Sequence, residues 1–496
     1  MLFQEESFLL IFLPIFLFVF FVLNKMKRKN LVIWITAASI VFYSIYNLGN
    51  VPVILFSIIC NFIFGLLIKN NCSNGSLFLK LGILFNIIYL AFFKYLDFII
   101  KNINSISSTE YNSLNIELPL AISFFTFQQI AYLVDLKKGL IKVTSLKKYL
   151  AFVLFFPQLI AGPIVRFQQI IDQLNEEYLS KIRINYFQNG FCLFSLGLFK
   201  KHFIADGICP ITDSLFVITD LEKIPSLAES WIGMTAFGLQ IYFDFSAYSD
   251  MALGLALMIG INLPANFNSP YQATNIIDFW RKWHITLSQF LRDYLYIPLG
   301  GNRLGVPRSI FNSFLVMAIG GLWHGASWTF ICWGFFHGLI IGITHIAKSI
   351  LKGKTSTLNR LVHYLLFNRY NLFIIITLSW VLFRSENFNQ AKIIYESMLG
   401  LNGFDLSRSM EQITFGSHIR HQGFLPNQEL DITLIPFIPV LLSIVWFLPN
   451  SNIFIHEDKY SERISTAKLI ACLIMFFLSV KLALENTSYE FIYFKF

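Results

Sequence analysis

Long apolar segments recur from one end of the chain to the other, with shorter polar stretches between them. A helix that spans a membrane needs about 20 mainly apolar residues, and this rule selects the candidate elements. The candidates are 7–24, 31–47, 51–68, 77–100, 118–135, 149–163, 187–206, 230–261, 310–347, 371–383, 432–448 and 467–484. Segments 230–261 and 310–347 are long enough for two elements each, whereas 149–163 and 371–383 are short enough to be re-entrant or interfacial. The pattern predicts an all-α polytopic membrane protein with about 11–13 membrane elements.

Two polar regions interrupt this pattern. Residues 264–308 are rich in proline, asparagine and basic side chains, and residues 384–431 form an insert that is too long for an ordinary connection. We find no internal repeat, so the inverted repeats of many transporters have no support here. We predict one membrane domain over 1–496, made of N-terminal helices (1–148), a motif-bearing catalytic core (149–347), the polar insert (384–431) and C-terminal helices (432–496).

Composition agrees with the membrane assignment. Hydrophobic residues make up 55% of the 496 residues and charged residues only 14%, against about 25% charged in soluble domains. Glu5 and Glu6 precede the first apolar segment, where a signal peptide would carry positive charge. We therefore expect this segment to be a retained helix and not a cleaved signal.

The net charge of +9 is concentrated in a few connections, notably 25–29 and 137–148, whereas the connection 47–51 holds no lysine or arginine. Basic loops favour the cytoplasmic side, so we expect the N-terminus outside and 137–148 in the cytoplasm. Topology then explains the charge without a nucleic-acid partner. The six cysteines lie far apart and no Cys-x-x-Cys or His-Glu-x-x-His motif occurs, so we expect no metal site and no disulfide framework.

The most informative stretch runs from Gly320 to Trp333 and places His324 among apolar and aromatic residues. An ionisable group in an apolar membrane segment indicates a functional site. An imidazole titrates near neutrality, which suits it to act as a general base. Glycines beside His324 permit close approach of backbone or ligand, and Trp323, Trp328 and Trp333 are candidates to wall a slot.

Two other apolar stretches carry unexpected residues. Pro157 and Pro163 interrupt one of them, which predicts either irregular backbone that lines a cavity or a kinked packing helix. Asp244 and Asp250 lie in the other, where carboxylates are costly. Their role is either structural hydrogen bonding or the orientation of a catalytic histidine and the binding of substrate.

The stretch Phe279–Arg303 reads as an amphipathic helix followed by a turn, with Trp280, His284 and Ser288 at spacing four on one face. Its basic residues suit either an interfacial helix or a docking surface for a phosphorylated donor such as coenzyme A, or for an acidic carrier protein. The candidate substrate-binding residues are Asp244, Asp250, Trp323, Ser288, Arg281 and Arg303.

Together these stretches resemble the membrane-bound O-acyltransferase family, in particular its membrane subunits for O-acetylation of alginate and peptidoglycan. The matching pieces are Ile122–Gln128, Pro157–Pro163, Gly197–Lys201, Tyr242–Asp250, Phe279–Arg303, Trp323–Trp333 and Phe491–Phe494. The resemblance implies membrane helices and re-entrant segments around a central catalytic pore. It maps the catalytic histidine of the Trp-His-Gly motif onto His324 and the second family histidine onto His284. Lys282 replaces an arginine that is common in the family, a conservative departure.

The resemblance further implies transfer of an acyl group, acetyl in that branch, from acetyl coenzyme A or another cytoplasmic thioester, with no bound cofactor. The acceptor would be an extracytoplasmic polysaccharide, reached with a separate SGNH-type acetyltransferase partner, and the location the bacterial cytoplasmic (inner) membrane, in contact with lipid. We expect His324 to act as base and His284 to orient the donor or stabilise the oxyanion. Three alternatives stay open: D-alanyl transfer for teichoic-acid modification, a transporter without chemistry, and a lipid acyltransferase.

Overall fold

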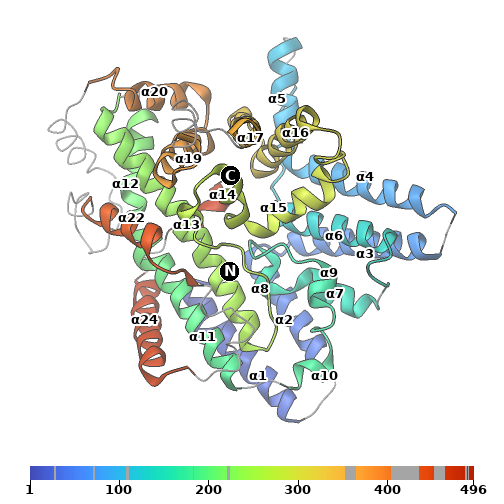
Figure 1. Ribbon diagram of the computed structural model, residues 1–496. Coiled ribbons are helices and arrows are strands. Elements are labelled where there is room, and N and C mark those ends of the chain that lie inside the picture. Colours follow the sequence, from blue (N-terminus) through green and yellow to red (C-terminus); the bar gives the residue numbers. More distant parts are fainter. Residues whose placement is uncertain are drawn as a thin grey trace. The chain divides into compact units, whose positions relative to one another are not determined.

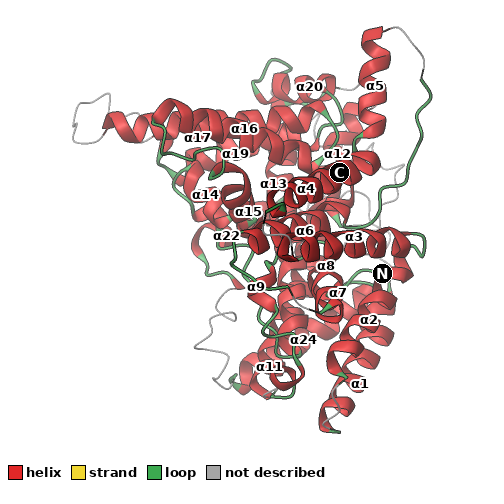
Figure 2. Ribbon diagram, turned by 90° about the vertical axis from the view of Figure 1, so that its right-hand side faces the viewer, coloured by secondary structure: helices red, strands yellow, loops and turns green. Residues whose placement is uncertain are grey.

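The computed structural model describes residues 1–26, 30–70, 73–107, 111–143, 145–181, 184–220, 224–351, 365–403, 435–451, 464–485, 489 and 491–495. Within these residues the secondary structure is helical and contains no strand (Figures 1 and 2). The all-α prediction is confirmed. Lys27, Arg28, Lys29 and all but 384–403 of the predicted polar insert lie outside the described residues.

The chain forms two compact units, each assembled from segments that are far apart in sequence. Unit 1 comprises Met1–Leu196, Tyr248–Ala265 and Phe454–Val480, and unit 2 comprises Gly197–Ala247, Asn266–Ile453 and Lys481–Phe496. The predicted catalytic core 149–347 is therefore divided between the two units. The prediction of one membrane domain stays a prediction.

Unit 1 contains most of the long apolar helices. Its elements are η1 (Phe8–Phe12), α1 (Leu13–Lys25), α2 (Leu31–Tyr46), α3 (Asn50–Asn70), α4 (Gly75–Lys94), α5 (Leu96–Ser107), α6 (Ile122–Lys137), α7 (Leu146–Leu154), α8 (Phe156–Leu159), α9 (Phe167–Ile170), α10 (Glu176–Leu179), and most of α11 (Ile184–Phe199) and α24 (Thr466–Leu484). The apolar segment 77–100 divides at Tyr95 into α4 and α5, and 149–163 contains α8, most of α7 and irregular backbone. Segment 7–24 covers η1 and α1, 187–206 covers α11 and η2, and 31–47, 51–68, 118–135 and 467–484 each match one helix.

Unit 2 contains the motif-bearing helices. Its elements are η2 (Lys200–Ala205), α12 (Asp206–Asp220), the first part of α13 (Leu227–Met258), η3 (Pro270–Gln272), α14 (Ile276–Lys282), α15 (Ile285–Leu291), η4 (Arg292–Tyr296), α16 (Val306–His324), α17 (Trp328–Leu351), α19 (Arg369–Arg384), α20 (Phe388–Met398), α22 (Phe437–Phe447) and η7 (Ile492–Lys495). Segment 310–347 forms two helices as the length suggested, whereas 230–261 forms the single helix α13.

Among the residues that the structure describes, five helices are long and apolar enough to cross a membrane: Phe8–Lys25, Asn50–Asn70, Gly75–Lys94, Trp328–Ser349 and Thr466–Leu484. The shorter helices Leu31–Tyr46 and Phe437–Phe447 are also apolar. Their outward side chains are large and hydrophobic, such as Phe18 at 70% exposure and Phe477 at 66%. Such surfaces suit lipid contact, and the chain is a multi-pass membrane protein.

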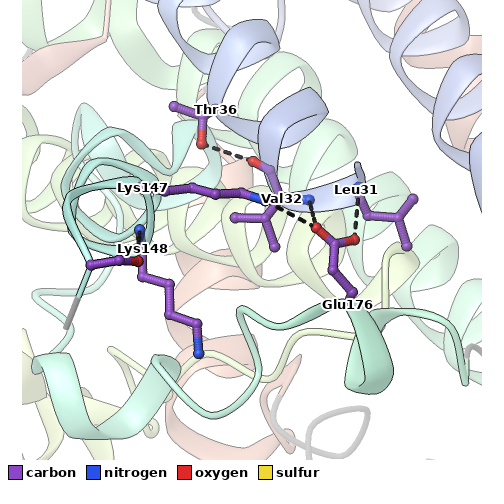
Figure 3. A network of polar contacts seen from close by, with 7 residues as sticks. Leu31, Val32, Thr36, Lys147, Lys148 and Glu176 are labelled. Carbon is purple, nitrogen blue, oxygen red and sulfur yellow. Dashed lines mark hydrogen bonds and ion pairs between the residues drawn. The ribbon is translucent and has the colours of Figure 1, made fainter. Parts of the chain in front are cut away.

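A carboxylate fixes the start of α2 in unit 1 (Figure 3). Glu176 accepts hydrogen bonds from the N–H groups of Leu31 at 2.8 Å and Val32 at 3.3 Å, and pairs with Nζ of Lys147 at 3.4 Å. The first N–H groups of a helix lack intrahelical partners and favour a negative charge. Glu176 therefore links α2, α7 and α10, and its cationic partner Lys147 belongs to the predicted basic connection 137–148.

The proline-interrupted stretch also lies in unit 1. Helices α7 and α8 are followed by irregular backbone, and every residue from 155 to 165 is buried. The N–H of Phe156 donates to Ser39 Oγ at 3.1 Å, and Gln158 Nε2 donates to the carbonyl of Phe152 at 2.7 Å. Irregular backbone at this depth is thus satisfied by protein groups, which favours the packing interpretation of Pro157 and Pro163.

Candidate active site

Two glycines bring α16 and α17 into backbone contact, and this contact places His324 at the last position of α16. A Cβ atom on Gly321 would lie 2.2 Å from the carbonyl oxygen of Phe330, and one on Gly334 would lie 2.2 Å from that of Met317. Only glycine permits this approach. The helices lie side by side in Figures 1 and 2. Of the glycines beside His324, Gly321 is approached by the backbone of α17, whereas Gly325 is approached by the ring of Phe330.

Aromatic rings surround His324, whose exposure is only 7%. The ring centroids of Trp323, Trp333, Phe383 and Tyr493 lie 5.0, 5.3, 5.3 and 5.7 Å from that of the imidazole, and the Trp333 ring is perpendicular to it at 90°. These four rings come from α16, α17, α19 and η7. Two of the three predicted tryptophans thus wall His324.

The third tryptophan, Trp328, is 52% exposed at the first position of α17. It does not belong to the set of rings named above. Tyr493 was not singled out as a site residue by the sequence analysis, although it lies in the closing aromatic stretch Phe491–Phe494 that supports the resemblance.

The predicted helix through Phe279–Arg303 is wrong in one important respect. The chain forms α14, then Trp283 and His284 in non-helical conformations, and then α15. His284 is the N-cap of α15 with φ 41° and ψ 56°, a left-handed conformation that non-glycine residues adopt only when the surroundings impose it. Trp280, His284 and Ser288 therefore do not lie on one face of one helix.

His284 is fully buried, and its ring has one polar partner that fixes its tautomer. Nδ1 lies 3.1 Å from Oδ1 of Asn266, and the same oxygen accepts hydrogen bonds from the N–H of Thr286 at 3.3 Å and its Oγ1 at 2.9 Å. Because the Thr286 N–H can only donate, the Asn266 atom is an acceptor and His284 Nδ1 carries the proton. Nε2 then holds a lone pair, and it is buried without a hydrogen-bond partner among the residues that the structure describes.

The indole ring of Trp323 neighbours the rings of both histidines. The ring of Trp323 is 5.0 Å from that of His324 and 6.2 Å from that of His284. Phe245 on α13 makes a second link, since its ring is 4.7 Å from His284 and 4.2 Å from Tyr493, which in turn contacts His324. Both histidines thus belong to unit 2 and share one aromatic cluster.

A third histidine in this region, His337 on α17, has hydrogen-bond partners at both ring nitrogens. Trp280 Nε1 lies 3.4 Å from Nδ1 and donates to it, and Nε2 lies 3.1 Å from Ser379 Oγ, which donates onward to the carbonyl of Ile376 at 2.7 Å. Because the indole can only donate, Nδ1 accepts and Nε2 carries the proton. This chain of hydrogen bonds gives His337 a structural role.

A buried charge cluster lies at the start of unit 2. Lys201 Nζ is 2.8 Å from Oδ1 of Asp206 and 3.1 Å from Oδ1 of Asp244, and each side chain is at most 6% exposed. Oδ2 of Asp244 accepts the N–H of Ile492 at 2.8 Å. These contacts give Asp244 a structural role, and its predicted role in substrate binding stays a prediction. Lys201 was not among the predicted site residues, although a lysine in an apolar segment is itself an indication of a special role.

The remaining predicted substrate-binding residues lie in different surroundings. Asp250 is buried on α13, in the part of this helix that belongs to unit 1. Ser288 donates its hydroxyl to the carbonyl of Trp283 at 3.3 Å. Arg281 and Arg303 are exposed, one at the end of α14 and the other in the turn after η4. Their roles stay predictions.

The residues that the structure describes contain no group of three or more histidine, cysteine, aspartate or glutamate side chains with the arrangement of a metal site. His284 lies outside the five apolar helices that are long enough to cross a membrane in the described part of the chain. Burial lowers the pKa of His284 to about 3, so this ring is neutral at physiological pH. The neutral ring of His284 can therefore accept a hydrogen bond at Nε2 within the aromatic cluster.

Comparison with known proteins assigns the family. The family model described as MBOAT, membrane-bound O-acyltransferase family, matches residues 32–384. A peptidoglycan O-acetyltransferase of Helicobacter pylori is 36% identical over 96% of this chain and 94% of its own length. A probable alginate O-acetylase AlgI of Azotobacter vinelandii is 38% identical over 82% of this chain and 80% of its own length.

A more distant relative carries a different activity in its name. A teichoic acid D-alanyltransferase of Streptococcus thermophilus is 28% identical over 44% of this chain and 55% of its own length. The family match, the whole-length relatives and the two histidines in one aromatic cluster agree with the resemblance drawn from the motifs. The chain belongs to the membrane-bound O-acyltransferase family and is an O-acyltransferase.

Proposed function

We propose that this protein moves an acetyl group from a cytoplasmic thioester, such as acetyl coenzyme A, to an extracytoplasmic polysaccharide of a bacterial envelope. Two relatives that match most of this chain support this assignment by their names, peptidoglycan O-acetyltransferase and probable alginate O-acetylase. The observation that carries the mechanism is the position of His324, buried at the end of α16 inside four aromatic rings. The location would be the bacterial cytoplasmic membrane.

In the proposed step, His324 acts on the hydroxyl that receives the acetyl group. The imidazole takes the hydroxyl proton while the oxygen attacks the thioester carbonyl carbon, so a C–O bond forms. The tetrahedral intermediate then collapses, the C–S bond breaks, and the leaving thiolate takes the proton from the imidazolium. A base positioned in this way contributes about 10²–10⁴-fold to the rate.

The tautomer of His284 changes the role expected for this residue. An oxyanion needs hydrogen-bond donors, and a neutral ring with its proton on Nδ1 offers only a lone pair at Nε2. We therefore assign His284 the role of a hydrogen-bond acceptor. Its Nε2 would receive a hydrogen bond from a substrate hydroxyl or thiol. Stabilisation of the oxyanion would fall to other groups.

The proposal also implies that chemistry and export are coupled. The donor is cytoplasmic and the polymer lies outside, so the site must be reached from both faces of the membrane. The acceptor of the first transfer could then pass the acetyl group to a separate extracytoplasmic acetyltransferase of SGNH type. This partner, like acetyl coenzyme A itself, is part of the proposal.

The test is the amount of ester-linked acetyl on envelope polymers of a deletion strain. The strain is complemented with the wild-type gene, with His324→Ala or with His337→Ala, at matched protein levels in the membrane. We expect acetyl ester with the wild type and with His337→Ala, and its loss with His324→Ala. Equal acetyl ester in all three strains would refute the role of His324, and ester-linked alanine in place of acetyl would refute the donor.

A further inference from the structure

Asn266 is connected to the break between α14 and α15 by both its backbone and its side chain. Its carbonyl oxygen accepts the N–H of Ile285 at 2.9 Å, and its Oδ1 accepts from the N–H and the hydroxyl of Thr286. These bonds satisfy donors at the start of α15 that have no partner within the helix. Asn266 thereby stabilises the chain reversal in which His284 adopts its left-handed conformation.

The same Oδ1 atom also receives Nδ1 of His284 at 3.1 Å. Asn266 is only 2% exposed and His284 is completely buried, so water does not compete for this bond. The opposite edge of the ring carries the lone pair of Nε2, and the rings of Phe245 and Trp323 lie 4.7 and 6.2 Å from the imidazole. One asparagine thus fixes the backbone, the ring orientation and the proton position of this histidine.

We infer that Asn266 is a positioning residue for acyl transfer, which holds His284 as the Nδ1–H tautomer so that Nε2 accepts a hydrogen bond from the substrate. The inference rests on the proposed function. The inference goes beyond that function because neither the motifs nor the names of the relatives assign a role to Asn266. A buried carboxamide is suited to this task, because it orients the imidazole without adding a charge that would favour the imidazolium.

Neighbouring charges leave this arrangement intact. On α13, Asp244 is paired with Lys201, and on α14, Lys282 is paired with Asp278 at 2.9 Å. The other ionisable rings of the cluster are His324 on α16 and Tyr493 on η7. A carboxylate at position 266 would place a negative charge within hydrogen-bond distance of the His284 ring.

The first experiment measures acetyl transfer from radiolabelled acetyl coenzyme A in membrane vesicles that contain full-length wild type, Asn266→Ala, Asn266→Asp or the control Asn268→Ala. Asn268 is exposed and lies two residues away in the same connection. We expect Asn266→Ala to lower the rate per folded molecule by about 10- to 100-fold, and Asn268→Ala to leave it unchanged. Equal rates for Asn266→Ala and the wild type would overturn the inference.

Asn266→Asp separates positioning from a merely structural role. It keeps the acceptor for Thr286 and His284, but its charge favours the imidazolium and raises the pKa of His284. The acid limb that protonation of His284 imposes on the rate profile should therefore move upward from near pH 3 by about 1–3 units, with activity lost in mildly acidic solution and recovered near neutral pH. An unshifted profile, or a variant that stays inactive at every pH while folded, would contradict the inference.

A second measurement does not depend on activity. Solid-state NMR of protein labelled with ¹⁵N-histidine, compared with His284→Gln, should assign a protonated Nδ1 and an unprotonated Nε2 to His284. A protonated Nε2 in the wild type would refute the inference whatever the rates. If the wild type forms no acetyl ester while the NMR spectrum shows the expected tautomer, the proposed function fails and the positioning of His284 stands.

Discussion

The N–H of Ile492 donates a hydrogen bond of 2.8 Å to Oδ2 of Asp244, and this bond ties the C-terminal segment to α13 across 248 residues of sequence. Asp244 is held in turn by Lys201, which also pairs with Asp206. One residue after Ile492, Tyr493 contacts the ring of His324. The buried charge cluster therefore fixes a segment that completes the aromatic surroundings of the candidate base.

Removing the cation of this cluster should destabilise the protein strongly. Lys201→Met leaves two carboxylates buried without their partner, which costs about 3–5 kcal/mol. We expect a marked loss of folded protein in a thermal-unfolding assay in detergent. Lys181→Met is the control, because Lys181 pairs with Glu177 at an exposed site and should have no measurable effect. Equal stability of the two variants would contradict a structural role for the cluster.

Loss of the Tyr493 ring should lower activity more than loss of its hydroxyl. The ring lies 5.7 Å from that of His324 and 4.2 Å from that of Phe245, so its contribution to the site is mainly packing. We expect Tyr493→Phe to retain acetyl transfer within a few-fold, and Tyr493→Ala to reduce it about tenfold or more. A large loss in Tyr493→Phe, measured in the vesicle assay, would instead assign a role to the hydroxyl.

The adjacent glycines of α16 should respond differently to a methyl group. A Cβ on Gly321 would lie 2.2 Å from the Phe330 carbonyl oxygen, whereas the nearest atom to a Cβ on Gly320 is Leu291 Cδ1 at 3.3 Å. We expect Gly321→Ala to cost about 1–3 kcal/mol or more through overpacking of α16 against α17, and Gly320→Ala to be tolerated. The comparison is made by the yield of monodisperse protein and its melting temperature.

The two histidines of this helix pair should also separate stability from activity. His337→Ala leaves Trp280 Nε1 without its acceptor and should cost about 1–3 kcal/mol, while the rate per folded molecule changes little. His324→Ala should leave the folded yield near that of the wild type and lower the rate about 10²–10⁴-fold. A specific loss of rate in His337→Ala at normal stability would show that His337 takes part in the reaction.

Burial of neutral His284 makes a definite contribution to the pH dependence of stability. Because its pKa is lowered to about 3 in the folded protein, from about 6.5 when unfolded, the unfolded state binds the extra proton between these values. The contribution is complete above pH 6.5 and is lost as the pH falls toward 3, by up to about 1.4 kcal/mol per pH unit. The melting temperature of the wild type should therefore fall relative to that of His284→Gln between pH 7 and pH 5. A constant difference would contradict a neutral buried ring.

Most of the helices could be predicted because each one is an apolar segment with its own length limit. The exceptions have causes that hydropathy does not encode. Segment 77–100 divides at Tyr95, and the helix expected through Phe279–Arg303 breaks at His284. The break depends on Asn266, 18 residues upstream, which supplies the hydrogen bonds that α15 lacks at its start. An i, i+4 pattern cannot reveal a cap from outside the helix.

The sequence by itself determined that the protein is an all-α membrane protein, and it pointed to His284 and His324 as candidate site residues. Apolar segments require helices in a membrane, and histidines in such surroundings mark a site because burying them is costly without a function. Tertiary structure alone decided how those residues are used. It joined Asp244 to Lys201 and Ile492, bound both nitrogens of His337 into packing, and left Nε2 of His284 as an acceptor. Hydrogen-bond partners and ring contacts arise between segments far apart in the chain, so they follow from packing and not from local pattern.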